Sequence, residues 1–109
     1  MAKSNSAQSA LDMLILTVLS QRGPIHGYGI ATTIQEISEE ALRVDEGSLY
    51  PALHRMEEAD WITAEWMITE NKRRARIYKI SRAGLKQLAT EREKWKSFAA
   101  GVARVLRFA

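Results

Sequence analysis

The stretch DEGSLYPALHRM, residues 45–56, decides the interpretation of the whole chain. Its apolar residues recur at steps of three and four, which is the spacing of one buried helix face; they are Leu49, Ala52, Leu53 and Met56. Proline interrupts a helix except in the first turn, where its missing N–H has no intrahelical partner. We therefore predict a helix over residues 47–60, with Pro51 in its first turn and Asp45 or Ser48 as the N-cap.

The N-terminal end of this 47–60 helix carries side chains that suit the edges of DNA bases. Hydroxyl, aromatic, imidazole and guanidinium groups can all reach base edges in a major groove. These groups belong to Ser48, Tyr50, His54 and Arg55, and Pro51 lies among them at the same end of the helix. Arg55 is the strongest candidate contact, because its planar guanidinium is always charged. The stretch is therefore interpreted as a recognition helix.

Two further helices are expected before it. Residues 1–8 are small and polar and are predicted to be disordered. A helix is predicted from Ser9 to about residue 22, where Gly23 and Pro24 end it. A second helix is predicted over residues 26–37, and Gly27 and Gly29 in its first turn indicate close approach of a backbone or a phosphate. Helix, loop 38–44 and helix form a helix-turn-helix arrangement.

After the 47–60 helix the pattern changes from helical to β-rich. Residues 62–69 and 76–80 are predicted strands, and the polar segment 70–75 joins them as a hairpin. Helices followed by a basic hairpin give the order of a winged helix-turn-helix domain. The fold class is therefore α+β, mainly helical. Residues 1–81 are predicted to form the DNA-binding domain.

Positive charge is concentrated at this hairpin, the wing. Residues 71–82 contain six bases and no acid, whereas residues 36–60 contain eight acids and only two arginines. One dense basic block indicates contact with a polyanion. The predicted phosphate or minor-groove contacts are Lys72, Arg73, Arg74 and Arg76. Tyr28, at the start of the second helix, is a further candidate phosphate contact.

The last segment, residues 82–109, is predicted to be one long helix that begins at the capping Ser81. At about 1.5 Å per residue it is roughly 40 Å long, more than so small a domain can cover. It is therefore not an independent domain but a dimerisation helix, whose partner is a second copy of the chain. The predicted interface residues, from this helix and the first, are Leu11, Ile15, Leu88, Trp95, Phe98, Val102 and Leu106.

Composition excludes several classes of function. The chain of 109 residues has no cysteine, which excludes disulfides and thiolate chemistry. Two distant histidines do not indicate a metal site, and we expect no cofactor. No phosphate loop or carboxylate pair predicts an enzyme. The longest apolar run is too short to cross a bilayer and has no signal-peptide pattern, so a cytoplasmic location without membrane contact is expected.

The chain resembles the PadR family of bacterial transcriptional regulators. The resemblance rests on HGYGI at 26–30, on GSLYPALHRME at 47–57, on RRARIYKIS at 73–81, and on Ala83-Gly84. It implies a homodimeric repressor of the small branch of the family, with a single dimerising helix, bound to a palindromic operator in double-stranded DNA. Two positions depart from the family pattern, where glycine is common: Asp60, and the pair Asn71-Lys72.

Two alternatives stay open from the sequence. Trp95 is either a dimer-core residue or, as the resemblance implies for some family members, part of a site for a small planar effector that releases DNA. The whole fold could also serve as a winged-helix protein-interaction module without DNA binding. The discriminating feature is the wing, because a protein-binding module has no need for Arg73, Arg74 and Arg76 together.

Overall fold

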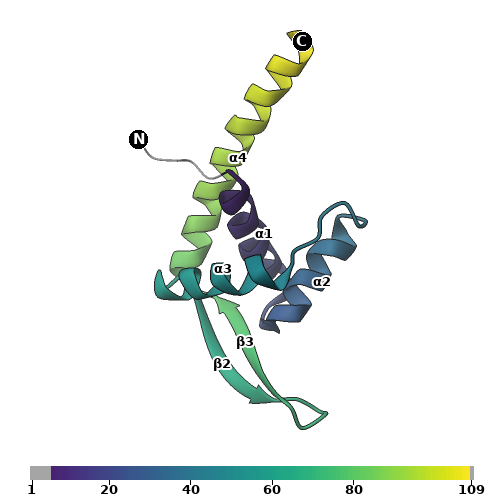
Figure 1. The fold of residues 1–109 in the computed structure, drawn as a ribbon. Coiled ribbons are helices and arrows are strands. Elements are labelled where there is room, and N and C mark those ends of the chain that lie inside the picture. Colours follow the sequence, from purple (N-terminus) through teal and green to yellow (C-terminus); the bar gives the residue numbers. More distant parts are fainter. Residues whose placement is uncertain (1–5, 109) are drawn as a thin grey trace.

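The computed structural model describes residues 6–108, which form four helices and a three-stranded antiparallel sheet (Figure 1). In chain order these are α1 (Ser6–Arg22), β1 (Ile25–His26), α2 (Gly27–Ile37), α3 (Glu46–Glu58), β2 (Ile62–Ile68), β3 (Arg74–Ile80) and α4 (Arg82–Phe108). The predicted α+β, mainly helical winged helix-turn-helix fold with a long C-terminal helix is confirmed. No helix in the described residues is long and apolar enough to cross a membrane.

Helix α1 runs through the centre of the core and contacts α2, α3, α4 and β3. Because neighbours surround it, it buries apolar side chains on more than one side, including Ile15, Leu16 and Leu19. The helix begins at Ser6, so the prediction that residues 6–8 are disordered is wrong. Residues 1–5 of that predicted segment lie outside the described residues.

Helix α3 begins one residue earlier than predicted, at Glu46. Asp45 is its N-cap, and the Asp45 carboxylate accepts a hydrogen bond from the backbone N–H of Ser48 (2.8 Å). Pro51 therefore lies in the second turn, and its predicted place in the first turn is wrong. The carbonyl of Gly47, four residues earlier, loses its helical donor. Gly47 is exposed, so water can take that place.

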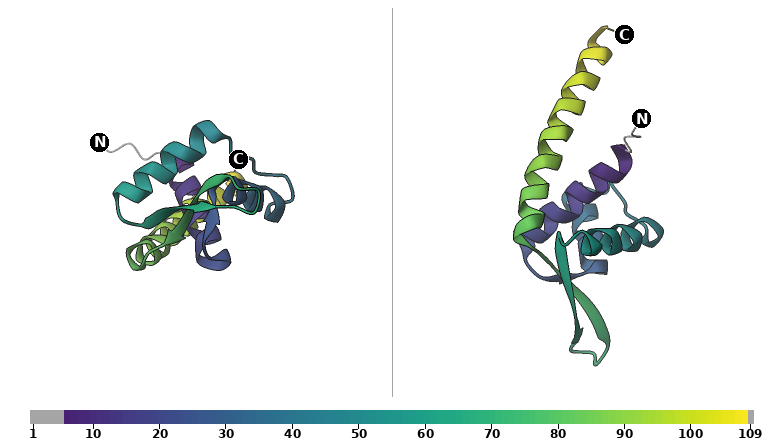
Figure 2. Two further views of the ribbon diagram at one scale, coloured as in Figure 1. Left: turned by 90° about the horizontal axis from the view of Figure 1, so that it is seen from below. Right: turned by 90° about the vertical axis from the view of Figure 1, so that its left-hand side faces the viewer.

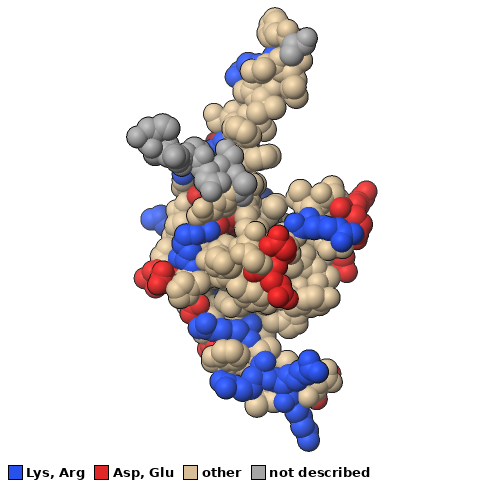
Figure 3. Space-filling model, viewed as in Figure 1, with Lys and Arg blue, Asp and Glu red and all other residues tan. Residues whose placement is uncertain are grey.

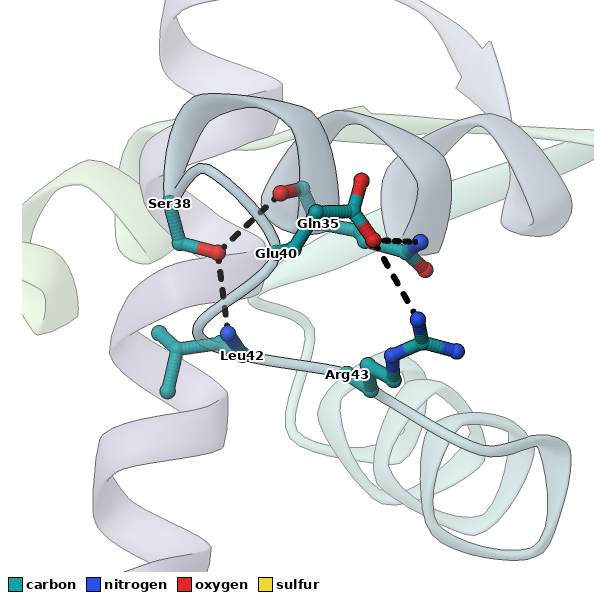
Figure 4. Close-up of polar contacts among 5 residues, drawn as sticks. All are labelled: Gln35, Ser38, Glu40, Leu42 and Arg43. Atoms are coloured by element: carbon teal, nitrogen blue, oxygen red, sulfur yellow. Dashed lines mark hydrogen bonds and ion pairs between the residues drawn. The ribbon is translucent and has the colours of Figure 1, made fainter.

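The loop between α2 and α3 is held by its own side chains (Figure 4). The Ser38 hydroxyl donates to the carbonyl of Gln35 and accepts from the N–H of Leu42. One carboxylate oxygen of Glu40 accepts from the Gln35 amide (2.7 Å) and from Arg43 (3.3 Å). These bonds fix the path of the chain between the end of α2 and the start of α3.

Strand β3 is the centre of the sheet, whose order is β1-β3-β2. The short β1 was not predicted, because two residues carry no detectable alternation. Strand β3 also begins two residues earlier than expected, at Arg74. Trp66 pairs with Arg76 across the hairpin, and the same face of β3 continues to Tyr78. Tyr78 is the buried residue of β3, whereas Ile77 is only half-buried.

Helix α4 leaves the domain at the end opposite to the wing (Figures 1 and 2). The hydroxyl of Ser81 accepts from the N–H of Gly84 (3.0 Å), which confirms the predicted cap. The backbone carbonyl of Trp61 lies directly against the Cα of Gly84, where a Cβ would overlap it. Further along, Leu88 and Glu91 are also buried, so the first part of α4 packs on the domain.

Asp60 and Lys72 both have left-handed backbones, with φ of 64° and 61°. They end α3 and turn the wing at the two departures from the family pattern. Glycine adopts this conformation freely, whereas a side chain there costs about 1–2 kcal/mol, less for aspartate.

We expect Asp60→Gly to raise the free energy of unfolding by up to about 1 kcal/mol, because the left-handed strain is removed. Thermal unfolding at one protein concentration measures this change. Asp60→Val, which increases the strain, should lower the Tm. A lower Tm for Asp60→Gly than for the wild type would contradict the expectation.

Candidate nucleic-acid interface

A groove of about 750 Å³ lies between the wing and the N-terminal ends of α2 and α3. Tyrosines, a tryptophan and three arginines line it, among them Tyr28, Tyr50, Trp66, Arg73, Arg74 and Arg76. In the space-filling view, the lysines and arginines gather at the lower end of the molecule, over the wing (Figure 3). The structure therefore brings together the three predicted wing arginines and the two predicted tyrosines, whereas Lys72 does not line the groove.

The floor of the groove is built from α2 and α3. The ring of Tyr50 lies on Gly27, where a Cβ would stand only 2.9 Å from ring atoms. This explains Gly27: the close neighbour is an aromatic ring, not a backbone or a phosphate. His26 caps α2, and its Nδ1 accepts from the N–H of Gly29 (2.8 Å). Tyr28 stands beside this helix start and is 72% exposed.

The wing wall of the groove contains a tryptophan that the sequence analysis missed. The guanidinium of Arg74 lies 4.6 Å from the centroid of the Trp66 ring, and that of Arg76 lies 5.7 Å from it. Cation–π contact attracts both arginines to the ring. The sequence does contain a signal for this residue, because Trp66 lies at an alternating position of a predicted strand and tryptophan is rarely left exposed.

Tyr78 closes the inner end of the groove. Burial raises the pKa of its hydroxyl, and the positive charge of Arg76 opposes part of that rise. The hydroxyl therefore stays neutral at physiological pH and presents no negative charge to a bound polyanion.

Arg55 is bound within the protomer. Its two terminal nitrogens lie 2.8 and 3.0 Å from the two carboxylate oxygens of Asp12, whose side chain is only 7% exposed. The hydrogen bond to Asp12 raises the pKa of the Arg55 guanidinium. Arg55 is predicted to be the strongest DNA contact of the helix. In the structure, however, both terminal nitrogens of its guanidinium bind Asp12 of α1. The contact between Arg55 and DNA therefore stays a prediction, and the ion pair with Asp12 accounts for the position of the side chain.

Arg76 is paired in a similar way. Its Nη2 lies 2.7 Å from Oε2 of Glu57, and the two side chains are 37% and 28% exposed. This ion pair joins β3 of the wing to α3. Arg74 and Arg76 share a face of the strand, as expected, but only Arg74 has no carboxylate partner among the described ion pairs.

The remaining predicted contacts on α3 are accessible. Ser48, Pro51 and His54 are exposed, and Tyr50 is 42% exposed. His54 lies 3.4 Å from Glu58, four residues later, an exposed pair worth little in stability. Lys72 and Arg73 are exposed at the tip of the wing. The described residues contain no group of three or more His, Cys, Asp or Glu that could hold a metal ion.

The predicted dimer residues separate into two sets. Ile15 and Leu88 are 0% and 6% exposed in the protomer, so the prediction that they contact a second copy is wrong. Their apolar stripe is buried because the first part of α4 packs on α1 of the same chain. Leu11 is half-buried against the core. The exposed members of the set are Trp95, Phe98, Val102 and Leu106.

Comparison with known proteins agrees with this architecture. The model of the Transcriptional regulator PadR-like family matches residues 15–90. A 68-residue segment, 62% of this chain, is 35% identical to Transcriptional regulator Rv3488 of Mycobacterium tuberculosis, and it spans only 60% of that protein.

Solved structures of similar size share the fold. A transcriptional regulator from Clostridium thermocellum superposes with a TM-score of 0.82 at 27% identity, over 93% of this chain and 97% of that one. A PadR-like transcriptional regulator from Bacillus cereus gives a TM-score of 0.73 at 27% identity, over 94% and 97%. The family match covers most of the chain and includes the recognition helix and the wing. The chain belongs to the PadR-like family of transcriptional regulators.

Proposed function

We propose that this regulator binds double-stranded DNA as a homodimer and represses transcription from a palindromic operator. The observation that carries the proposal is the basic groove between α3 and the wing. Exposed α3 residues enter a major groove in this arrangement. The DNA backbone beside them lies in the groove between helix and wing.

The groove has the chemistry of a phosphate site. Arg73 and Arg74 supply charge, and Tyr28 and Tyr50 supply hydroxyl donors on the opposite side. The N-terminal end of α2 adds the positive end of a helix dipole. Sequence preference then comes from the α3 side chains that face outward, Ser48, Pro51 and His54.

The dimer is supported by the far half of α4. Its exposed apolar side chains continue over three turns and end at Leu106 and Phe108, which are 70% and 90% exposed. An apolar surface of this kind is unfavourable in water unless another chain covers it. A second copy covers it symmetrically and places two α3 helices on one side of the DNA.

The ring centroids of Trp95 and Phe98 lie 5.7 Å apart on this same α4 surface. Such an aromatic pair suits both a dimer core and the wall of a site for a planar effector, so the effector stays a prediction.

The proposed function is tested with operators selected by the protein from random duplex DNA. We expect inverted half-sites with centres about one helical turn, roughly 10 base pairs, or a multiple of it apart. Affinity measured by fluorescence anisotropy should fall steeply between 50 and 200 mM salt, since phosphate contacts release counterions. Sedimentation should give two chains per operator. Recovery of no preferred sequence, or an affinity that is independent of salt, would contradict the proposal.

Repression itself is tested separately. A reporter placed behind the selected operator should give less transcript when the protein is present. More transcript would identify an activator.

A further inference from the structure

Two ion pairs fasten opposite sides of the recognition helix to the rest of the domain. Residues 55 and 57 of α3 are two positions apart, which places them about 200° apart around a helix of 3.6 residues per turn. Arg55 binds Asp12 of α1, and Glu57 binds Arg76 of the wing. Both contacts join segments that are distant in sequence, at separations of 43 and 19 residues.

The Arg55–Asp12 pair is not free to open for a phosphate. The Asp12 side chain is 7% exposed, so a departing Arg55 would leave a buried carboxylate without a partner. Removing one partner of such a pair is strongly destabilising. The amide of Gln8 also lies beside the Arg55 guanidinium. The fork of Arg55 is therefore set by α1.

The contacts of the Glu57–Arg76 pair are also well defined. Glu57 binds one terminal nitrogen of Arg76, while the guanidinium also lies near the Trp66 ring. Among the described residues, the Nε of Arg76 is buried and has no hydrogen-bond partner, so the pair with Glu57 is its carboxylate contact through Nη2 alone. The pair joins the C-terminal end of α3 to β3 of the wing, and its Arg76 lines the groove.

We propose that Arg55 and Arg76 are positioning residues, which act through Asp12 and Glu57 to fix the orientation of α3 relative to the domain and the wing. This inference rests on the proposed DNA binding. Sequence readout requires the α3 side chains to reach base edges while the wing holds the backbone, so both must keep one relative geometry. Binding to DNA of any sequence needs only the charges and tolerates a change of angle.

For Glu57→Gln, the positioning role and simple electrostatics predict opposite changes in the affinity for the operator. Glu57→Gln removes a negative charge close to DNA, which by charge alone should tighten binding to every duplex. If Glu57 positions the wing, the variant should instead lose specificity. We expect the ratio of affinities for the selected operator and a scrambled duplex to fall by about tenfold, while affinity for the scrambled duplex holds or rises.

Two further variants control the test. Glu46→Gln makes the same charge change at an exposed position of α3 that has no ion pair among the described residues, and should leave the ratio unchanged. The double variant Glu57→Arg with Arg76→Glu restores an ion pair between the same two positions, with the charges exchanged. It should recover most of the ratio that Glu57→Gln loses, even though total affinity falls with the wing charge. For the other pair, Asp12→Asn keeps the shape of the carboxylate, and at a temperature where it is folded it should also lower the ratio.

Each outcome decides one question. If the wild type itself shows no preference for any selected duplex, the proposed function fails. If the wild type discriminates and Glu57→Gln keeps its ratio, or the exchange does not recover it, only the positioning role is overturned. A rise in affinity for both duplexes by the same factor in Glu57→Gln would assign Arg76 to ordinary phosphate contact.

Discussion

Replacing Lys72, Arg73 and Arg74 together by alanine is expected to lower operator affinity about 100-fold. Each charged contact to phosphate contributes on the order of 1 kcal/mol net, and three such losses multiply to this factor. The slope of log affinity against log salt should also become shallower by about 3, one unit for each lost phosphate contact. Fluorescence anisotropy over a salt series measures both quantities.

The matched control removes three exposed charges away from the groove. Arg22, Lys86 and Lys94 lie in α1 and α4, and their change to alanine alters net charge by the same amount. That variant should keep most of its affinity and its salt slope. Sedimentation should show the same assembly for both variants. Equal loss of affinity in both would mean that net charge, not the wing, governs binding. Retained affinity in the wing variant would mean that the wing does not hold the DNA backbone. No operator binding by the wild type would favour a protein-interaction module.

Gly84→Ala is expected to be the most destabilising small substitution in the chain. The added methyl would overlap the backbone carbonyl of Trp61, which cannot move away as a flexible side chain can. Helix α4 must then shift from the domain, at a cost of about 1–3 kcal/mol for overpacking. For a domain of this size that corresponds to a fall in Tm of roughly 10 °C.

Gly101→Ala is the matched control, because it adds the same methyl to the same helix where nothing in the protomer lies within 4 Å. It should leave stability unchanged or raise it by up to about 1 kcal/mol through helix propensity. Thermal unfolding of both variants at one protomer concentration makes the comparison, since the stability of a dimer depends on concentration. An unchanged Tm for Gly84→Ala would show that the two segments can separate at no cost.

The fold was predictable from the sequence because its strongest patterns are local. The three- and four-residue spacing around Leu49 and the cap at Asp45 act over a few residues, and both are confirmed. Pro51 was placed one turn too early, because a proline pattern alone does not distinguish the first turn from a tolerated second turn with a solvated carbonyl. Strand β1 was too short to give any period.

The partners of the site residues were not predictable in the same way. The sequence marks Arg55 and Arg76 as charges, but their acids lie 43 and 19 residues away in the chain. Only the packing of α1 and the wing against α3 brings these groups together. The same limit explains Ile15 and Leu88: an apolar stripe shows that a surface is covered, but not whether the same chain or a second copy covers it.

The close contact between Gly84 and the carbonyl of Trp61 also sets the point about which α4 would tilt relative to the domain. The helix continues for 24 residues beyond Gly84, so at about 1.5 Å per residue that part is roughly 36 Å long. A tilt of about 5° at Gly84 moves the far end by about 3 Å, close to the axial step of one base pair, roughly 3.4 Å. In the proposed dimer the two copies of α4 set the distance between the two α3 helices, so one added methyl at position 84 should change the operator spacing that the dimer accepts.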